Sequence, residues 1–150
     1  MKNRLIIIAA ILLAGFLGVE NYNNTPTLAN RDVATQSSHN NDAEFAQAYE
    51  RRATKLQMAG QGTVAKVLPD DNDGSRHQRF ILRLASGQTL LVAHNIDLAP
   101  RVAAIQAGDT VEFYGQYEWS EKGGVIHWTH DDPRGRHVGG WLKHNGQTYQ

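Results

Sequence analysis

Cysteine is absent from this chain of 150 residues. Its absence excludes a disulfide framework, a zinc site with thiolate ligands and a cysteine nucleophile, so a metal site here must use His, Asp or Glu. An excess of either charge is also missing, because 15 basic residues balance 15 acidic ones. The protein as a whole therefore carries no net positive charge that would attract nucleic acid or an anionic membrane. The chain also lacks a serine nucleophile motif, a phosphate-binding glycine loop and a dinucleotide fingerprint.

Long apolar runs are equally scarce, and the clearest one stands at the start. Lys2 and Arg4 precede an apolar stretch from Leu5 to Val19, the layout of a secretory signal. A membrane-spanning helix needs ~20 apolar residues, so we expect residues 1–19 to be a signal peptide, with a short membrane anchor as the alternative. The protein is then exported, periplasmic or extracellular, and membrane-anchored if the leader is not cleaved.

Residues 20–40 are rich in Asn, Thr and Ser and show no apolar periodicity, which predicts a disordered linker. The remaining residues, 41–150, form one domain of ordinary size. Asn41 with Glu44 three residues later predicts a helix start, and Phe45, Tyr49 and Leu56 continue one apolar face at helical spacing.

After Gly60 the apolar period changes from helical to strand-like. Alternation of apolar and polar residues predicts strands over 62–68, 79–84, 89–94, 111–119 and 125–129, and Asn145-Gly146 predicts the turn of a terminal hairpin. Residues 100–106 predict one or two helical turns. We therefore expect a mainly β fold, a small five-stranded OB-like Greek-key barrel with an N-terminal helix and a C-terminal hairpin.

Three polar clusters stand at expected strand ends, where loops from distant parts of the chain could converge on one site. They span residues 70–77, 94–97 and 127–137 and contain five of the seven histidines. This predicts a divalent-metal site, zinc or similar, with hydrolytic activity on an anionic substrate. The expected metal ligands are His94, His127, His130 and His137. The expected catalytic groups are Asp97, Asp131 and His77, and the expected substrate-binding groups are Arg76 and Arg79.

Two other interpretations stay open at this stage. The histidines can be structural, donating hydrogen bonds to nearby carbonyls and carboxylates, because proximity in sequence is the sole evidence for a shared site. The domain can also be an envelope binding module without chemistry, which holds an oligonucleotide, oligosaccharide, peptide or haem. Haem ranks behind a divalent metal as a cofactor. The expected partner is a small or polymeric anionic ligand, nucleic acid included, with a membrane contacted solely through an uncleaved N-terminal segment.

Four motifs carry a family resemblance: Gly60 to Asp71, His77-Gln78-Arg79-Phe80, His94 to Arg101, and His127 to Pro133. Together they resemble a family of uncharacterised bacterial secreted proteins known only as a domain of unknown function. The resemblance covers about residues 60–149. It implies an exported bacterial protein and brings no established activity.

Two fainter resemblances concern other OB barrels. Asp97-Leu98-Ala99-Pro100 is loosely similar to a segment of the thermonuclease family, which implies carboxylates and arginines around calcium. Asp70, Asp71, Asp73 and Arg101 would join the candidates in that case, although Arg101 replaces the Glu that this family places after the proline. The haem chaperone of cytochrome c maturation is also similar in layout, but its His-to-Tyr motif is missing.

Overall fold

The computed structural model describes residues 41–150. The expected signal peptide (1–19) and linker (20–40) lie outside the described residues. Within residues 41–150, no helix has the length and apolar character needed to cross a membrane.

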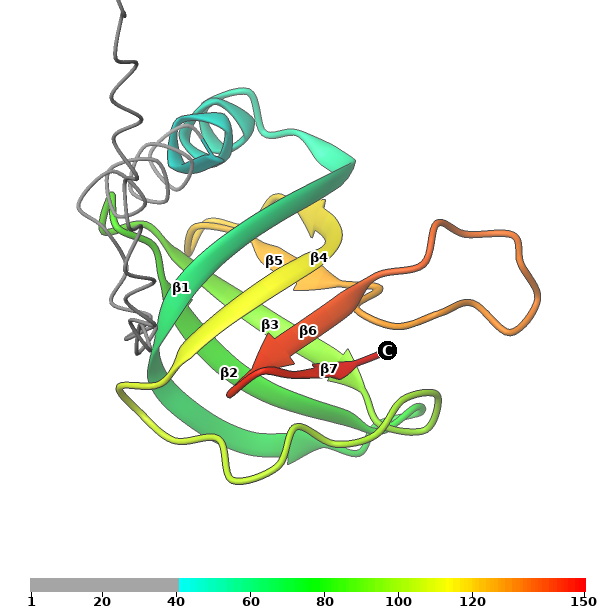
Figure 1. Ribbon diagram of the computed structural model, residues 1–150. Coiled ribbons are helices and arrows are strands. Elements are labelled where there is room, and N and C mark those ends of the chain that lie inside the picture. Colours follow the sequence, from blue (N-terminus) through cyan, green and yellow to red (C-terminus); the bar gives the residue numbers. More distant parts are fainter. Residues whose placement is uncertain (1–40) are drawn as a thin grey trace, which may run out of the picture.

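Seven strands form one sheet that closes into a barrel (Figure 1). They are β1 (Thr54–Asp71), β2 (His77–Arg83), β3 (Thr89–Asn95), β4 (Thr110–Glu118), β5 (Val125–His127), β6 (Trp141–His144) and β7 (Gln147–Tyr149). The order is β1-β2-β3-β5-β4-β6-β7, and β1 also pairs with β4, so the first five strands make a closed ring. Neighbours in the ring are antiparallel except β3 and β5. The predicted five-stranded OB-like barrel is confirmed.

Alternation along the strands separates the inside of the barrel from the outside. The inward side chains are buried and make one core that includes Phe80 and Leu82 of β2, Leu90 and Val92 of β3, and Phe113 of β4. The intervening residues of β2 and β3 point outward. The outward side chains of β2 and β3 together form one continuous outer face of the barrel.

The N-terminal helix covers residues 41–50 and closes one end of the barrel. Its Phe45 is fully buried and lies with its ring centroid 5.7 Å from that of Phe113 and 6.0 Å from that of Tyr117. Asp42 accepts a hydrogen bond from the backbone of Ser86, which ties the helix to the β2–β3 turn. Together these contacts hold the helix across the barrel end.

The expected helical face through Leu56 is wrong, because Leu56 belongs to β1. The helix ends in a Schellman motif: Arg52 donates to the carbonyl of Tyr49 (3.0 Å) and Ala53 donates to that of Ala48 (2.9 Å). Arg52 adopts a φ of 52°, which turns the chain away from the helix axis into the strand. The motif has no glycine, so the usual sequence signal for a helix end is missing.

The helical turns expected at 100–106 are absent, and this prediction is wrong. The side chain of Gln78 binds the backbone of Val102 in both directions, accepting from its N–H (2.8 Å) and donating to its carbonyl (3.1 Å). Ala104 has a φ of 51°, outside the helical region. A buried strand side chain thus takes the backbone groups that a helix would use.

The C-terminal hairpin is confirmed. Strands β6 and β7 pair antiparallel around Asn145 and Gly146, which have φ values of 50° and 78°, the pattern of a type I′ turn. Strand β6 follows β5 along the same side of β4. Residues 131–139, the projecting loop, leave the barrel between these two strands and extend to the side in Figure 1. The loop is closed at its base by a hydrogen bond from Gly140 N–H to the carbonyl of His130 (3.0 Å).

Candidate ligand-binding face

Parts of all three polar clusters line one pocket at the end of the barrel where β2 begins and β3 and β5 end. The pocket has a volume of about 190 Å³ and is lined by Ser75, His77, Ala93, Asn95, Leu98, His127, Trp128 and His130. We call it the histidine pocket. Three of the expected site histidines thus line the same hollow: His77 from the start of β2, and His127 and His130 from the end of β5 and the residues after it.

Two of these rings are oriented by backbone carbonyls. Nδ1 of His77 lies 2.8 Å from the carbonyl oxygen of Ser75, and Nδ1 of His130 lies 2.7 Å from that of Asp131. A carbonyl oxygen can only accept, so each Nδ1 is the donor, and Nε2 of a neutral ring then carries the lone pair. This is the tautomer that metal-binding histidines commonly adopt.

His127 is held differently, at the end of β5. Its Nε2 lies 3.7 Å from a carboxylate oxygen of Glu118 and 3.4 Å from the amide nitrogen of Gln116. Burial lowers the pKa of His127 below its usual value, although the Glu118 carboxylate acts in the opposite direction. The ring is therefore mainly neutral at pH 7.

His94 and His137, the other two expected ligands, do not line this pocket. His94 is fully buried, with Nδ1 2.8 Å from the hydroxyl of Thr129 and Nε2 3.0 Å from the carbonyl of Pro100. Burial lowers the pKa of His94 to about 4. His137 stacks on Trp128 with ring centroids 3.9 Å apart, and its two nitrogens contact Gln116 and the backbone. Both rings thus have their nitrogens engaged within the protein.

The described residues, 41–150, contain no group of three or more His, Asp or Glu side chains arranged to hold a metal ion. The histidines of the pocket surround a hollow without meeting at one point. The metal site therefore stays a prediction.

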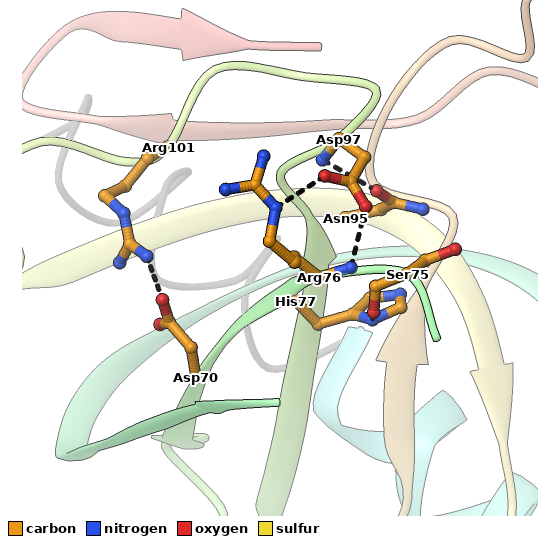
Figure 2. Close-up of polar contacts among 7 residues, drawn as sticks. All are labelled: Asp70, Ser75, Arg76, His77, Asn95, Asp97 and Arg101. Carbon is orange, nitrogen blue, oxygen red and sulfur yellow. Dashed lines mark hydrogen bonds and ion pairs between the residues drawn. The ribbon is translucent and has the colours of Figure 1, made fainter. Parts of the chain in front are cut away.

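Two ion pairs fasten the loops beside the pocket (Figure 2). Asp97 accepts from the backbone N–H of Arg76 (2.8 Å) and from its guanidinium Nε (2.7 Å), and Arg101 pairs with Asp70. The hydrogen bonds from Arg76 hold the pKa of Asp97 below its usual value. Asp97 is thus a weakened base, and Arg76 already has an anionic partner.

The remaining expected residues lie outside the pocket. Arg79 donates to the carbonyl of Pro69 (3.1 Å) and lies 3.9 Å from Asp71, on the outer face of β2. Asp131 is exposed at the base of the projecting loop. Its neighbour Asp132, which the sequence prediction did not select, organises that loop by accepting backbone hydrogen bonds from residues 134, 136 and 137. These bonds hold the pKa of Asp132 low.

A second hollow was missed by sequence reasoning. It is an open groove of about 630 Å³, lined by Leu68, Ile81, Thr89, Leu91, Ser120, Glu121, Lys122, Gly124 and Val125. We call it the aliphatic groove. A signal was present, because Ile81 and Leu91 are apolar residues at positions that alternate to the outside of the barrel.

The groove and the histidine pocket lie on the same face. Leu91 lines the groove and Ala93 lines the pocket, two residues apart on the outward side of β3. The same relation holds on β5, where Val125 lines the groove and His127 lines the pocket. The outer face of β2, β3 and β5 thus carries both hollows end to end.

The fold and this face define a small OB-type β-barrel protein with a candidate ligand-binding surface. The chain belongs to the family described as "Protein of unknown function (DUF3465)", whose model matches residues 28–150. The predicted membership of a family of unknown function is confirmed. No curated protein matches the chain.

Proposed function

We propose that this protein is a binding module that holds its ligand along the outer face of β2, β3 and β5. The observation that carries the proposal is the continuity of the aliphatic groove and the histidine pocket along β3. OB barrels use the strand 2–3 face and adjoining loops to bind ligands, and binding sites are concave, mostly apolar surfaces with a few polar groups. Both descriptions fit this face.

The polar groups around the pocket favour binding over hydrolysis. A general base should titrate near the working pH, whereas the pKa of Asp97 is lowered by its hydrogen bonds from Arg76. Asp131 is exposed and is not among the residues lining the histidine pocket. The hydrolytic mechanism is accordingly the weaker hypothesis.

A steric block in the middle of the face tests the proposal. Ala93 lines the histidine pocket on the outward side of β3, two residues from Leu91 of the aliphatic groove, so the larger side chain of Ala93→Trp should block the place where the two hollows adjoin. The probes are chitohexaose, an eight-residue thymidine oligonucleotide and an eight-residue acidic peptide, titrated into the full chain by calorimetry. We expect saturable binding of at least one probe and a loss of roughly tenfold or more in affinity on Ala93→Trp.

The matched control is Thr148→Trp, which adds the same side chain at an exposed site on β7. It should leave the affinity unchanged. Equal affinity of Ala93→Trp and the wild type, or no binding of any probe, would overturn the proposal. Circular dichroism and a thermal melt establish that each variant is folded.

Metal binding is the second candidate, and one observation favours it. His77 and His130 face the same pocket with Nδ1 fixed on a carbonyl, which leaves Nε2 as the lone-pair nitrogen of each neutral ring. With His127 they offer three imidazoles to a divalent transition metal such as zinc, provided that the rings turn toward a common point.

Zinc titration by calorimetry tests this candidate directly. The double variant His77→Ala/His130→Ala should lose at least tenfold in zinc affinity, while His39→Ala, outside the described residues, should keep it. Absence of zinc uptake, or equal uptake by the double variant, removes metal binding from consideration.

We also propose export, on the strength of the charged and apolar segment from Lys2 to Val19. The mass of the protein recovered from the cell envelope distinguishes a cleaved signal from a retained anchor. Recovery of the full-length chain in the cytosolic fraction alone would contradict export.

A further inference from the structure

The aliphatic groove has a floor built from four strands. Leu68 of β1, Ile81 of β2, Leu91 of β3 and Val125 of β5 each present a half-buried side chain to it. The solvent-facing positions of antiparallel strands commonly carry polar residues, so four aliphatic side chains in one concave hollow make it a candidate binding surface.

Basic side chains surround this floor. Lys122 lines the groove, Lys66 is the cross-strand partner of Ile81, and Arg83 is the cross-strand partner of Thr89. Cross-strand partners share a face of the sheet, so Lys66 and Arg83 lie on the same outer face as the groove. Lys66 and Arg83 are both exposed.

The charges of this rim are not balanced locally. Within residues 41–150, Lys66, Arg83 and Lys122 take part in none of the ion pairs with carboxylates. The acidic residues of this face are Glu121, which lines the groove, and Glu118, the cross-strand partner of Val125. Three cationic side chains against two carboxylates leave the rim of the aliphatic floor with a small net positive charge, in a chain whose total charge is zero.

The same face offers little to nucleic acid. Single-stranded nucleic acids bind OB barrels by stacking bases on aromatic side chains. The residues that line the groove include no Phe, Tyr or Trp, and Trp128 lines the histidine pocket instead. Aliphatic side chains with flanking carboxylates complement this surface better than bases with phosphates.

We propose that the aliphatic groove binds an extended peptide segment of a partner protein in which aliphatic and acidic residues alternate. In an extended chain, side chains alternate between opposite sides with a period of two. The aliphatic side chains of one side then pack on Leu68, Ile81 and Leu91, and the carboxylates of the other side stay in solvent, where the positive charge of the rim attracts them at low ionic strength. The inference rests on the proposed function and gives it a ligand class.

The test uses a fluorescein-labelled peptide of the sequence Leu-Glu-Val-Asp-Leu-Glu-Ile-Asp and the full chain, with fluorescence anisotropy as the readout. Its counterpart carries Lys at every acidic position, and the thymidine oligonucleotide serves as a nucleic-acid probe. We expect saturable binding of the acidic peptide, weakened at least tenfold by the double variant Arg83→Glu/Lys122→Glu and by raising the salt from about 0.05 to 0.5 M. The lysine peptide should bind at least tenfold more weakly than the acidic one.

Two further variants separate the floor from the rim and from general charge effects. Ile81→Ser removes part of the aliphatic floor and should also weaken binding of the acidic peptide. Lys143→Glu reverses one charge on β6, outside the groove, and disrupts an exposed 3.5 Å pair with Glu112, so it should leave binding unchanged, whereas the single variant Lys122→Glu, with the same change in net charge, should weaken it. Because the rim residues are exposed, their substitution does not endanger folding.

Several results would overturn the inference: equal binding of the lysine peptide, tighter binding of the oligonucleotide, or an affinity that is unchanged by Arg83→Glu/Lys122→Glu. Failure of the acidic peptide, together with binding of chitohexaose that Ala93→Trp abolishes, refutes the ligand class and leaves the proposed function intact. Failure of every probe refutes both.

Discussion

Nδ1 of His94 lies 2.8 Å from the hydroxyl oxygen of Thr129, inside the barrel and away from the histidine pocket. On the other side of the ring, Nε2–H donates to the carbonyl of Pro100 (3.0 Å). One neutral imidazole thus joins the end of β3, the β3–β4 connection and the segment after β5. These contacts support the loops that form the pocket.

The burial of His94 predicts a pH-dependent stability. Its pKa falls from 6.5 to about 4 on folding, so between these values the unfolded chain binds the additional proton. The contribution of His94 is complete above pH 6.5, decreases as the pH falls and is lost near pH 4, a change of about 3 kcal/mol. Urea unfolding at intervals from pH 7.5 to pH 4 measures it.

His94→Gln is the control, since a glutamine retains hydrogen-bonding groups and does not titrate. The lowered pKa of His127 acts in the same direction and is present in both proteins, so the difference between the two curves isolates His94. If the free energy of unfolding changes equally with pH in the wild type and in His94→Gln, His94 does not have the assigned pKa.

The packing of Phe45 predicts that the helix is an integral part of the fold. Phe45→Ala should lower the free energy of unfolding by about 3 to 5 kcal/mol, because Phe45 is fully buried between the helix and the barrel. Glu44→Ala, at the exposed neighbouring position, should change it by no more than about 0.5 kcal/mol. A small effect of Phe45→Ala in chemical denaturation would mean that the barrel is stable without its helix.

The close packing around Gly140 predicts that the base of the projecting loop does not tolerate a larger residue at this position. A Cβ at this position would lie 2.1 Å from the carbonyl oxygen of Trp128 and 2.4 Å from that of Tyr114, both backbone atoms. Gly140→Ala should therefore cost the upper end of the range of about 1 to 3 kcal/mol for overpacking and should shift the NMR signals of the histidine pocket.

Gly135→Ala is the matched variant within the same loop. It has a φ of 61° and open space around its Cβ position, so the substitution should cost about 1 kcal/mol and leave the pocket signals in place. Equal effects of the two variants would contradict the close backbone approach at Gly140.

Substitution of the two adjacent aspartates at the loop base should affect the hydrogen exchange of the loop amides differently. Asp132→Ala removes the acceptor for backbone N–H groups of residues 134, 136 and 137, so these amides should exchange with solvent faster. Asp131→Ala should leave their exchange unchanged, because the side chain of Asp131 accepts none of these bonds. Hydrogen-exchange NMR compares the variants, and equal protection in both would refute the role of Asp132.

The barrel could be predicted from sequence because strand alternation is a local signal. In the predicted strand over 89–94, a period of two puts His94 on the same side as Leu90 and Val92, and all three are buried inside the barrel. This position disfavours the ligand role that the sequence analysis expected for His94. The Asn145-Gly146 turn is equally local and is also confirmed.

Other features depend on contacts that a local pattern does not contain. The absence of a helix at 100–106 follows from the side chain of Gln78, which lies 24 residues from Val102 in sequence. The pairing of Arg76 with Asp97 similarly joins two residues that the sequence assigned to separate chemical roles. The polar clusters indicated where the loops meet, while the partners of each side chain required the fold.

A map of small-molecule binding by NMR tests the central claim most directly. The full chain, labelled with ¹⁵N, is titrated with a library of small organic fragments, and shifted backbone amides are assigned. We predict that shifts concentrate on the outward residues of β2, β3 and β5, including Ile81, Leu91 and His127. Shifts confined to other surfaces, such as the Tyr114 and Trp141 side of β4 and β6, would contradict the assignment of this face as the binding site.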